Sequence, residues 1–337
     1  MEILFLGTSS GTPTKQRNVS GIGLIESLGK NWYLIDCGEG TQQQILHTNL
    51  SLNRLSAIFI THKHGDHCYG LPGLLGSSGM QRRTRPLTLV APGAVYDWLL
   101  STQTITELYL PFELNFIPVE NLPQIEIGQF TTTTIQLSHR VPSYAYSFTE
   151  RYVEVTLDTQ SLLATGIPKG PQWGKIKNGI DVVHHGKIYT ATDFILKPRP
   201  PRNIIICGDN NNPELLKDTC ANCNVLVHES TYAKDLAQKA GHVGHSYSTQ
   251  IASFAEGLSI PNLVLTHFST RYQKDSKASC SIDTIRKEAQ LIYKGQLYLA
   301  EDFMHLLLKK SGKLLHIQKT SAKGYAATTR GYLPSNL

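Results

Sequence analysis

The stretch AIFITHKHGDH at residues 57–67 joins a short apolar run to a cluster of potential metal ligands. Its first five residues are mainly β-branched, aliphatic and aromatic, a composition typical of a buried strand. Gly65 relaxes the backbone, so a turn at the strand end can aim imidazoles and a carboxylate into one pocket. The stretch therefore predicts a metal site at the end of a strand, and its candidate ligands are His62, His64, Asp66 and His67.

Imidazole and carboxylate ligands together suit zinc, which accepts nitrogen and oxygen in a roughly tetrahedral shell. At catalytic sites zinc also keeps one position open for water. A solvated polar loop is the alternative interpretation of these residues. The density of potential ligands directly after a buried strand argues against that alternative.

Three more candidate ligands stand at the same kind of position, directly after an apolar run. They are His139, Asp209 and His267, which follow the runs TIQLS, IIICG and LVLT. Because strand ends line the clefts of layered α/β proteins, these side chains can converge on the His-rich turn. Taken singly, a polar residue after a strand is more often a cap or a turn residue.

The rest of the chain alternates short β-rich runs with helical stretches. We expect strands at residues 2–6, 21–26, 32–36, 57–61, 87–91, 125–127, 131–138, 145–150, 203–207, 224–228 and 262–266. We expect helices at residues 39–47, 70–80, 93–101, 213–218, 232–240, 248–255 and 282–293. Two halves of strands and helices imply a four-layer α/β protein, and the mixed second half is not doubly wound.

Residues 151–200 break this alternation. They are rich in Gly, Pro and Lys and include GIPKGPQWGK at residues 166–175. We interpret this segment as an excursion inserted into a single domain that spans residues 1–337.

Composition limits the class of protein. Among 337 residues, 40% are hydrophobic and 17% are charged, which argues against disorder. No apolar run reaches the roughly 20 residues of a membrane helix, and the N-terminus carries an acid where a signal peptide carries base. We therefore expect a soluble cytoplasmic protein. The formal net charge of +6 would suit a polyanionic partner but does not identify one.

Six cysteines are too few for a disulfide scaffold, and buried reduced thiols are the expected state. Cys220 and Cys223 have the spacing of a metal or redox pair. A zinc knuckle needs a second pair nearby, and the sequence has none.

The segment THKHGDH at residues 61–67 resembles the T-H-x-H-x-D-H motif of the metallo-β-lactamase superfamily. The resemblance implies a four-layer αβ/βα sandwich with a centre of two zinc ions, and hydrolysis as the chemistry. A later His, a bridging Asp and a final His complete the centre in that superfamily. The implied ligands are His62, His64 and His139 for one zinc, Asp66, His67 and His267 for the other, and Asp209 as the bridge.

Further segments, from FLGTS at residues 5–9 to AEDF at residues 300–303, are similar to the ribonuclease Z family. That family removes 3′ trailers from precursor tRNA. The segment PTKQRN at residues 13–18 matches its P-x-K-x-R-N loop, which is associated with reading the RNA 3′ end. The resemblance implies RNA contacts by Lys15, Arg17 and Asn18, and an ordinary surface turn is the alternative.

The insertion at residues 151–200 resembles the protruding, flexible arm with which this family grips the tRNA elbow. On such an arm Lys169, Lys175 and Lys177 would reach backbone phosphates far from the cut. A disordered linker is the alternative, although linkers seldom interrupt one domain and carry tryptophan. The chain has the length of the family's short form, which is usually a homodimer whose arm serves the partner subunit's site.

The segment VHEST at residues 227–231 matches the family's H-E-S/A-T motif, and GHS at residues 244–246 supplies a companion histidine. Cleavage leaves a ribose 3′ oxygen, a poor leaving group that needs a proton. The resemblance implies that Glu229 orients His245 and raises its pKa, so that the imidazolium donates this proton. A buried ion pair that serves stability is the alternative. The family's proton acceptor corresponds to Asp66, and Asn210 stands where Thr often follows the bridging Asp.

Together these resemblances imply a zinc-dependent endoribonuclease that cuts precursor tRNA after the discriminator nucleotide and leaves a 3′-hydroxyl. One alternative is a hydrolase of small phosphodiesters or aryl sulfates, which would share the metal cluster but have no use for the arm. Another is an RNA-binding module with a structural zinc. Structural zinc sites are closed and usually cysteine-rich, which argues against the second alternative.

Overall fold

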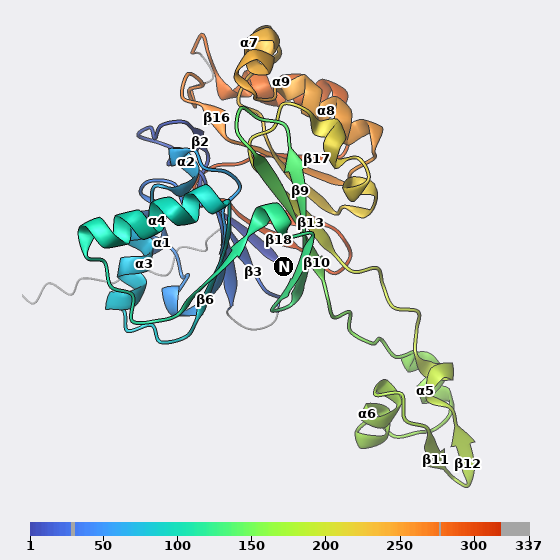
Figure 1. Ribbon diagram of the computed structural model, residues 1–337. Coiled ribbons are helices and arrows are strands. Elements are labelled where there is room, and N and C mark those ends of the chain that lie inside the picture. The colour runs from blue at the N-terminus through green and yellow to red at the C-terminus, as the bar shows by residue number, and fades with distance from the viewer. Residues whose placement is uncertain (28–30, 276–277, 318–337) are drawn as a thin grey trace, which may run out of the picture.

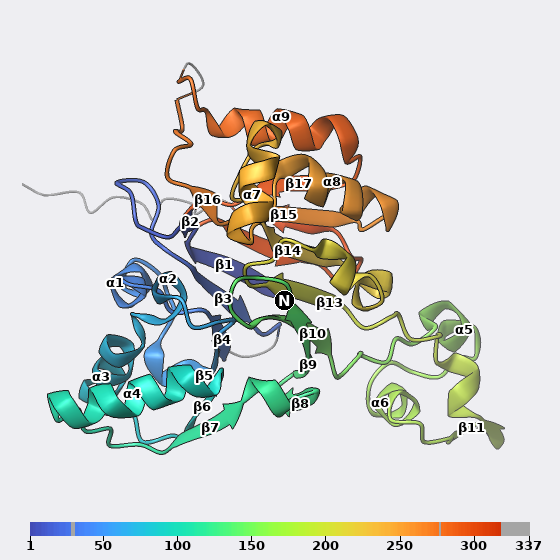
Figure 2. The ribbon, with the colours of Figure 1, turned by 45° about the horizontal axis from the view of Figure 1, so that its top comes forward.

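The computed structural model describes residues 1–27, 31–275 and 278–317, which form four layers and one projecting segment (Figure 1). Two β-sheets lie against each other in the centre, and helices cover the outer face of each sheet (Figure 2). This is the αβ/βα sandwich that the sequence predicts.

The first sheet has the strand order β19-β18-β1-β3-β4-β5-β6-β7. Its strands are β1 (Glu2–Gly7), β3 (Gly21–Ile25), β4 (Trp32–Ile35), β5 (Leu55–Phe59), β6 (Leu87–Ala91), β7 (Leu114–Pro118), β18 (His305–Leu308) and β19 (Leu314–His316). Strands β4 to β7 run parallel to one another, and the others pair antiparallel. The carboxyl ends of β4 and β5 therefore lie side by side at one edge.

The second sheet has the order β17-β15-β14-β13-β10-β9-β8. Its strands are β8 (Gln124–Ile127), β9 (Phe130–Leu137), β10 (Ser143–Glu150), β13 (Asn203–Cys207), β14 (Val225–Glu229), β15 (Asn262–Thr266) and β17 (Gln296–Leu299). Strands β13, β14, β15 and β17 are parallel neighbours, whereas β8, β9 and β10 pair antiparallel. The sheet is mixed, as the sequence predicts for this half.

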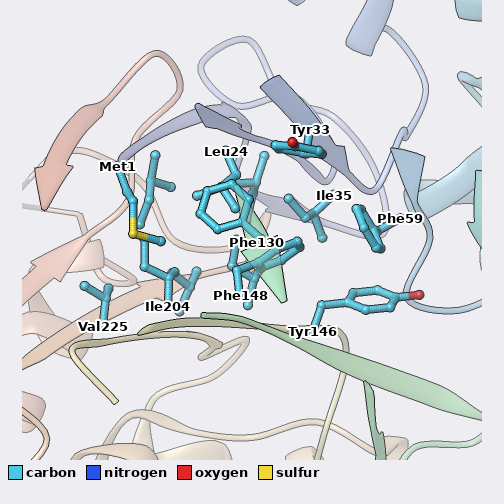
Figure 3. Packing of buried hydrophobic residues seen from close by; sticks show 14 of the residues in the cluster. Met1, Leu24, Tyr33, Ile35, Phe59, Phe130, Tyr146, Phe148, Ile204 and Val225 are labelled. Atoms are coloured by element: carbon cyan, nitrogen blue, oxygen red, sulfur yellow. The ribbon is translucent and has the colours of Figure 1, made fainter. Parts of the chain in front are cut away.

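Aromatic and aliphatic side chains from both sheets fill the space between them (Figure 3). Phe59 from β5 packs edge to face against Tyr146 and Phe148 from β10, with ring centroids 5.0 and 5.2 Å apart. All three side chains are fully buried. Edge-to-face packing of this kind adds stability beyond area burial. The core therefore fixes the strand ends of one sheet relative to those of the other.

The outer layers consist of α1 (Thr41–Leu46), α3 (Leu71–Met80) and α4 (Gly93–Thr106) on the first sheet, and α7 (Ala237–Val243), α8 (Ser248–Gly257) and α9 (Ile282–Ile292) on the second. Helix α9 shows how such a helix covers its sheet: Ile282, Ile285 and Ala289 recur at helical spacing and are buried. The Ser281 hydroxyl caps this helix by accepting the Asp283 N–H at 3.3 Å. No helix in the described part of the chain is long and apolar enough to cross a membrane.

Some elements differ from the prediction. Strands β7, β17, β18 and β19 were not predicted, because they are short edge or near-edge strands with partly exposed faces. The predicted helix at residues 232–240 is wrong in its start, since α7 begins at Ala237. The Tyr232 N–H donates to the Ser246 carbonyl at 3.3 Å, so this amide is satisfied outside a helix. Of residues 213–218, only Pro213–Leu216 form a short 3-10 turn.

The projecting segment leaves the second sheet after β10 and returns to it at β13. Its head contains α5 (Thr159–Ala164), α6 (Pro171–Lys177), β11 (Val182–His184) and β12 (Lys187–Tyr189), and lies apart from the sandwich in both views (Figures 1 and 2). The head has a small core of its own, made of Leu162, Ile167, Ile176, Val182, Ala191 and Phe194. The Trp173 indole N–H donates to the Ile167 carbonyl at 3.0 Å. The segment is thus a folded unit rather than a structureless linker.

Candidate metal centre

The seven predicted ligands come together at one edge of the sandwich. They lie just beyond strands of both sheets: the His-rich turn after β5, His139 after β9, Asp209 after β13 and His267 after β15. The turn includes the short helix α2 (Gly65–Cys68). Figure 2 shows β13, β14 and β15 side by side, so their carboxyl ends open onto this common edge. Such edges are where ligands bind in α/β proteins.

One subset of the ligands consists of His62, His64, His139 and Asp209. His64 Nδ1 lies 3.1 Å from His62 Nε2 and 3.2 Å from His139 Nε2. Asp209 Oδ2 lies 3.6 Å from His62 Nε2 and 3.7 Å from His139 Nε2. These four atoms surround a small common space.

A second subset consists of Asp66, His67 and His267. Nε2 of His67 and Nε2 of His267 are 3.2 Å apart, and Asp66 Oδ2 lies 3.5 and 3.4 Å from them. Asp209 also faces this subset, because its Oδ1 is 3.5 Å from His67 Nε2 and 3.4 Å from His267 Nε2. The two oxygens of Asp209 thus point to different subsets, as a bridging carboxylate requires.

The hydrogen bonds around the histidines test whether these residues fit a metal. His67 Nδ1 donates to Asp36 Oδ2 at 2.7 Å, and His139 Nδ1 donates to the Gly244 carbonyl at 2.6 Å. His267 Nδ1 lies 3.1 Å from the Thr231 hydroxyl. The carboxylate and carbonyl acceptors fix the tautomers of His67 and His139 and leave their Nε2 atoms as lone-pair donors, which is the usual support of a metal-bound imidazole.

The buried Asp209 supplies a further test. Its Oδ1 is enclosed and accepts no hydrogen bond from the described residues. A buried carboxylate oxygen without a partner is costly, and a bound cation would satisfy it. Burial, and after it the neighbouring His67, lower the pKa of His62 well below its usual value, which keeps this imidazole neutral. The donor set therefore fits a divalent metal that accepts nitrogen and oxygen.

Asp36, which the sequence analysis missed, supports the His-rich turn. Besides His67, its carboxylate accepts the Thr61 N–H at 2.8 Å and the Thr61 hydroxyl at 2.9 Å. Asp36 and His267 both have a positive φ, 59° and 57°, which is uncommon outside glycine and tends to occur at functional sites. Asp36 directly follows the apolar strand β4. The strand-end pattern that identified the candidate ligands would therefore also have identified this supporting residue.

Glu229 and His245 form a pair beside the centre. Glu229 Oε1 lies 3.1 Å from His245 Nδ1 and accepts the Ser246 N–H at 2.8 Å, while Oε2 accepts the Thr231 hydroxyl at 2.7 Å. Burial disfavours the charged imidazole, but the Glu229 and Asp209 carboxylates outweigh it and raise the pKa of His245 to about 9. His245 lies 3.7 Å from Asp209 and is partly exposed, so it can reach a substrate at the centre.

The loop predicted to bind RNA, residues 13–18, is supported by two of its own side chains. The Arg17 guanidinium donates to the Thr8 hydroxyl and to the Ala300 carbonyl, both at 2.7 Å. The Asn18 amide donates to the Glu39 carbonyl at 2.9 Å. These two side chains support the loop itself, and only Lys15 of the three predicted contacts is exposed. Gly11 anchors the loop at the centre, because its N–H donates to Asp66 Oδ2 at 2.7 Å.

The remaining residues singled out from the sequence fall in three places. Lys169, Lys175 and Lys177 lie on the head of the projecting segment, far along the chain from the ligands. His228 is fully buried, donates from Nδ1 to the Glu229 carbonyl at 2.7 Å and accepts from the Asn210 amide at 3.0 Å. His242 is exposed near the end of α7. Its hydrogen bonds and burial make His228 a structural residue.

The chain is similar to one family model, to curated relatives and to a solved structure. A family model described as "Anti-Pycsar protein Apyc1" matches residues 1–165, which include the His-rich turn. The chain is 51% identical to the Ribonuclease Z of Pseudomonas putida (strain GB-1), over 93% of this chain and 99% of that protein. It is 37% identical to the Ribonuclease Z of Bacillus subtilis (strain 168), over 91% and 98%. The crystal structure of human tRNase Z, short form, has a TM-score of 0.63 and 26% identity, covering 92% of this chain and all of that one.

Proposed function

The chain belongs to the ribonuclease Z family, and from this membership we propose that its His/Asp cluster is the two-zinc centre of the enzyme. The protein is an endoribonuclease that removes the 3′ trailer from precursor tRNA, cutting after the discriminator nucleotide and leaving a 3′-hydroxyl. The observation that supports the centre most directly is the buried Asp209, whose two oxygens face two separate ligand subsets.

We assign His62, His64 and His139 to one zinc, and Asp66, His67 and His267 to the other, with Asp209 between them. When bound, such a pair of ions supplies Lewis-acid polarisation of the phosphodiester and activation of water. Asp66 is the proposed acceptor of the proton from the attacking water. Its carboxylate is held toward the centre by the Gly11 N–H.

The proposed proton donor for the leaving group is His245. When the bond from phosphorus to the 3′ oxygen breaks, the electron pair remains on that oxygen, which is a poor leaving group unless it is protonated. Glu229 holds the imidazole through Nδ1 and favours its charged form. Two bound cations would offset the influence of Asp209, but Glu229 would still favour the imidazolium.

A direct experiment tests the centre. Purified protein is incubated with a precursor tRNA and, separately, with bis-nitrophenyl phosphate, before and after chelation, and the RNA ends are mapped. We expect one cut after the discriminator nucleotide and loss of both activities on chelation, restored by zinc. An activity that survives complete removal of metal would contradict the proposal.

We propose that the projecting segment, residues 151–200, is the tRNA-binding arm. Its head carries Lys169, Lys175 and Lys177, and Lys169 Nζ lies 5.6 Å from the Trp173 ring centroid. Cationic side chains on a projection can contact backbone phosphates far from the cut. An enzyme restricted to small phosphodiesters, the alternative function, gains nothing from such a unit.

Removal of the arm head should weaken cleavage of precursor tRNA but not hydrolysis of the small phosphodiester. The Leu196 N–H donates to the Thr156 carbonyl at 2.9 Å, so a short Gly linker can replace residues 156–196 without strain on the sheet. We expect the KM for precursor tRNA to rise at least about tenfold, because each charged contact to phosphate contributes about 1.5–3 kcal/mol. Hydrolysis of bis-nitrophenyl phosphate should be unchanged. Equal losses on both substrates, at matched folding, would reassign the segment to support of the centre.

We further propose that the protein is a homodimer. Four large apolar side chains project from α1, α3, α4 and the loop after α4, and are more than two-thirds exposed: Leu46, Met80, Ile105 and Tyr109. Single exposed apolar residues are normal, but these gather on neighbouring helices of one layer. A second copy of the chain would cover them, and sedimentation of the purified protein tests this.

A cytoplasmic location is also proposed. The cysteines of the chain are free thiols, and all but Cys280 are buried, as expected in a reducing compartment. Cys220 and Cys223 are buried in the second sheet's helical layer, where they pack with apolar side chains. This packing accounts for the pair without a metal.

A further inference from the structure

Beside His245, two cationic side chains lie against one aromatic ring, and a third acts on its hydroxyl. Tyr232 lies 6.3 Å from His245 between ring centroids. Lys239 Nζ from α7 lies 5.6 Å from the Tyr232 centroid, and Arg271 Cζ lies 5.8 Å from it. Arg140, next to His139, acts on the Tyr232 hydroxyl from a third segment. All three cations are exposed.

The backbone holds these segments together. The Ser248 N–H donates to the Tyr232 carbonyl at 3.0 Å, and the Ser269 N–H donates to the Thr231 carbonyl at 3.1 Å. The Tyr272 hydroxyl, next to Arg271, accepts the Ala233 N–H at 2.7 Å. Gly244 allows Arg140 to approach, since a Cβ there would lie 3.2 Å from the Arg140 nitrogen. The cluster is therefore held by fixed contacts around a largely buried tyrosine.

Like charges that converge on one spot repel one another unless an anion lies between them. Burial raises the pKa of Tyr232, Arg271 lowers it, Glu229 raises it and Arg140 lowers it, so two guanidinium charges and one carboxylate act on this hydroxyl. One carboxylate does not balance the three cations. A cationic rim with an aromatic floor is the chemistry that recognises a phosphate and the nucleotide attached to it.

The position of His245 decides which nucleotide this is. If His245 protonates the leaving 3′ oxygen, the nucleotide that carries this oxygen lies against His245. That nucleotide is the discriminator, which stays on the tRNA, and its own 5′ phosphate extends away from the centre. Tyr232 lies next to His245, within reach of a group attached to this nucleotide.

We propose that Tyr232, Arg140, Lys239 and Arg271 form the binding site for the phosphate on the 5′ side of the discriminator nucleotide. The site would hold the retained end of the RNA in line with His245. The proposal rests on the proposed role of His245 as proton donor. In this arrangement the trailer lies on the other side of the cut, away from this cluster.

The test pairs a protein change with a change of one phosphate. Single-turnover cleavage is measured for Arg271→Ala on three precursor tRNAs: unmodified RNA, RNA with an uncharged methylphosphonate on the 5′ side of the discriminator, and RNA with the methylphosphonate one linkage downstream of the cut. We expect a loss of roughly 10- to 100-fold on unmodified RNA, the scale of one charged hydrogen bond. The loss should nearly vanish on the upstream-modified RNA and persist on the downstream-modified RNA. Arg271→Lys should recover part of the rate.

Two comparisons keep the outcomes distinct. Arg54→Ala, which removes an exposed cation just before β5, at the end of that strand opposite the His-rich turn, should change none of the three rates. A loss in Arg271→Ala that persists on the upstream-modified RNA, or that vanishes only on the downstream-modified RNA, would overturn the proposal. His245→Ala is measured in parallel on unmodified RNA. Full activity of that variant would instead refute the role of His245 itself.

Discussion

Asp209→Ala is expected to empty the metal centre and to lower cleavage of precursor tRNA by at least about 10³-fold, because metal assistance supplies several kcal/mol to the transition state. Asp209 Oδ2 lies 3.6 Å from His62 and Oδ1 lies 3.4 Å from His267. Its two oxygens thus face the two different ligand subsets. One substitution should therefore affect both metal positions. Metal content per chain and single-turnover rate are the two measurements.

The fold should survive this change. The core between the sheets is made of apolar side chains and does not include Asp209. In the metal-free protein the variant also loses a buried carboxylate oxygen that has no hydrogen-bond partner. Asp97→Ala, an exposed carboxylate on α4, is the matched control and should behave as wild type. Near-full turnover with two metal ions per chain in Asp209→Ala would show that the cluster is wrongly assigned.

His245→Ala is expected to lower single-turnover cleavage of RNA by about 10²–10⁴-fold, the usual range for general acid catalysis. The metal content should stay constant, because the proposed assignment takes the ligand atoms from other residues. His245 contacts Glu229 through Nδ1, which leaves the rest of the ring to face a substrate. Zinc content and circular dichroism of the same preparation separate this effect from damage to the centre or the fold.

The leaving group supplies the decisive comparison for His245. Nitrophenolate departs without a proton, so the defect of His245→Ala should shrink on bis-nitrophenyl phosphate. Glu229→Gln should give a smaller defect on RNA, and the double variant should be no worse than His245→Ala alone. An equal loss on RNA and on the nitrophenyl substrate would mean that His245 supports the centre, and that the proton comes from another group.

Most of the candidate site could be predicted because each ligand is indicated by the residues next to it in the sequence. A strand followed at once by a polar ligand is readable in sequence, and His139, Asp209 and His267 were all found in this way. Their convergence could be expected, since parallel strand ends share an edge, and the superfamily resemblance implied that Asp209 bridges the two subsets. The distances from its two oxygens to each subset could not be predicted. They depend on the distance between the two sheets, which the aromatic core sets.

The parts that could not be predicted depend on contacts between distant segments. The resemblance implies an RNA contact by Arg17, and nothing in the sequence indicates that this side chain also bonds to Thr8 and to Ala300, the latter far away in the sequence. The cations around Tyr232 come from three separate segments and form no motif. Short edge strands such as β19 carry too few residues for a periodic signal, and only pairing with β18 defines them.

Because the arm head has a core of its own, it should unfold locally while the sandwich stays folded. The head is a unit of roughly 40 residues, a size at which an isolated domain is only marginally stable. Its backbone amides should therefore exchange with deuterium through local opening, long before those of β10 or β13, which open only with the whole sandwich. The same opening would expose the head to proteases while the centre stays intact. On the proposed role of the arm, a nick in this unit would remove recognition of tRNA and leave a chain that still hydrolyses small phosphodiesters.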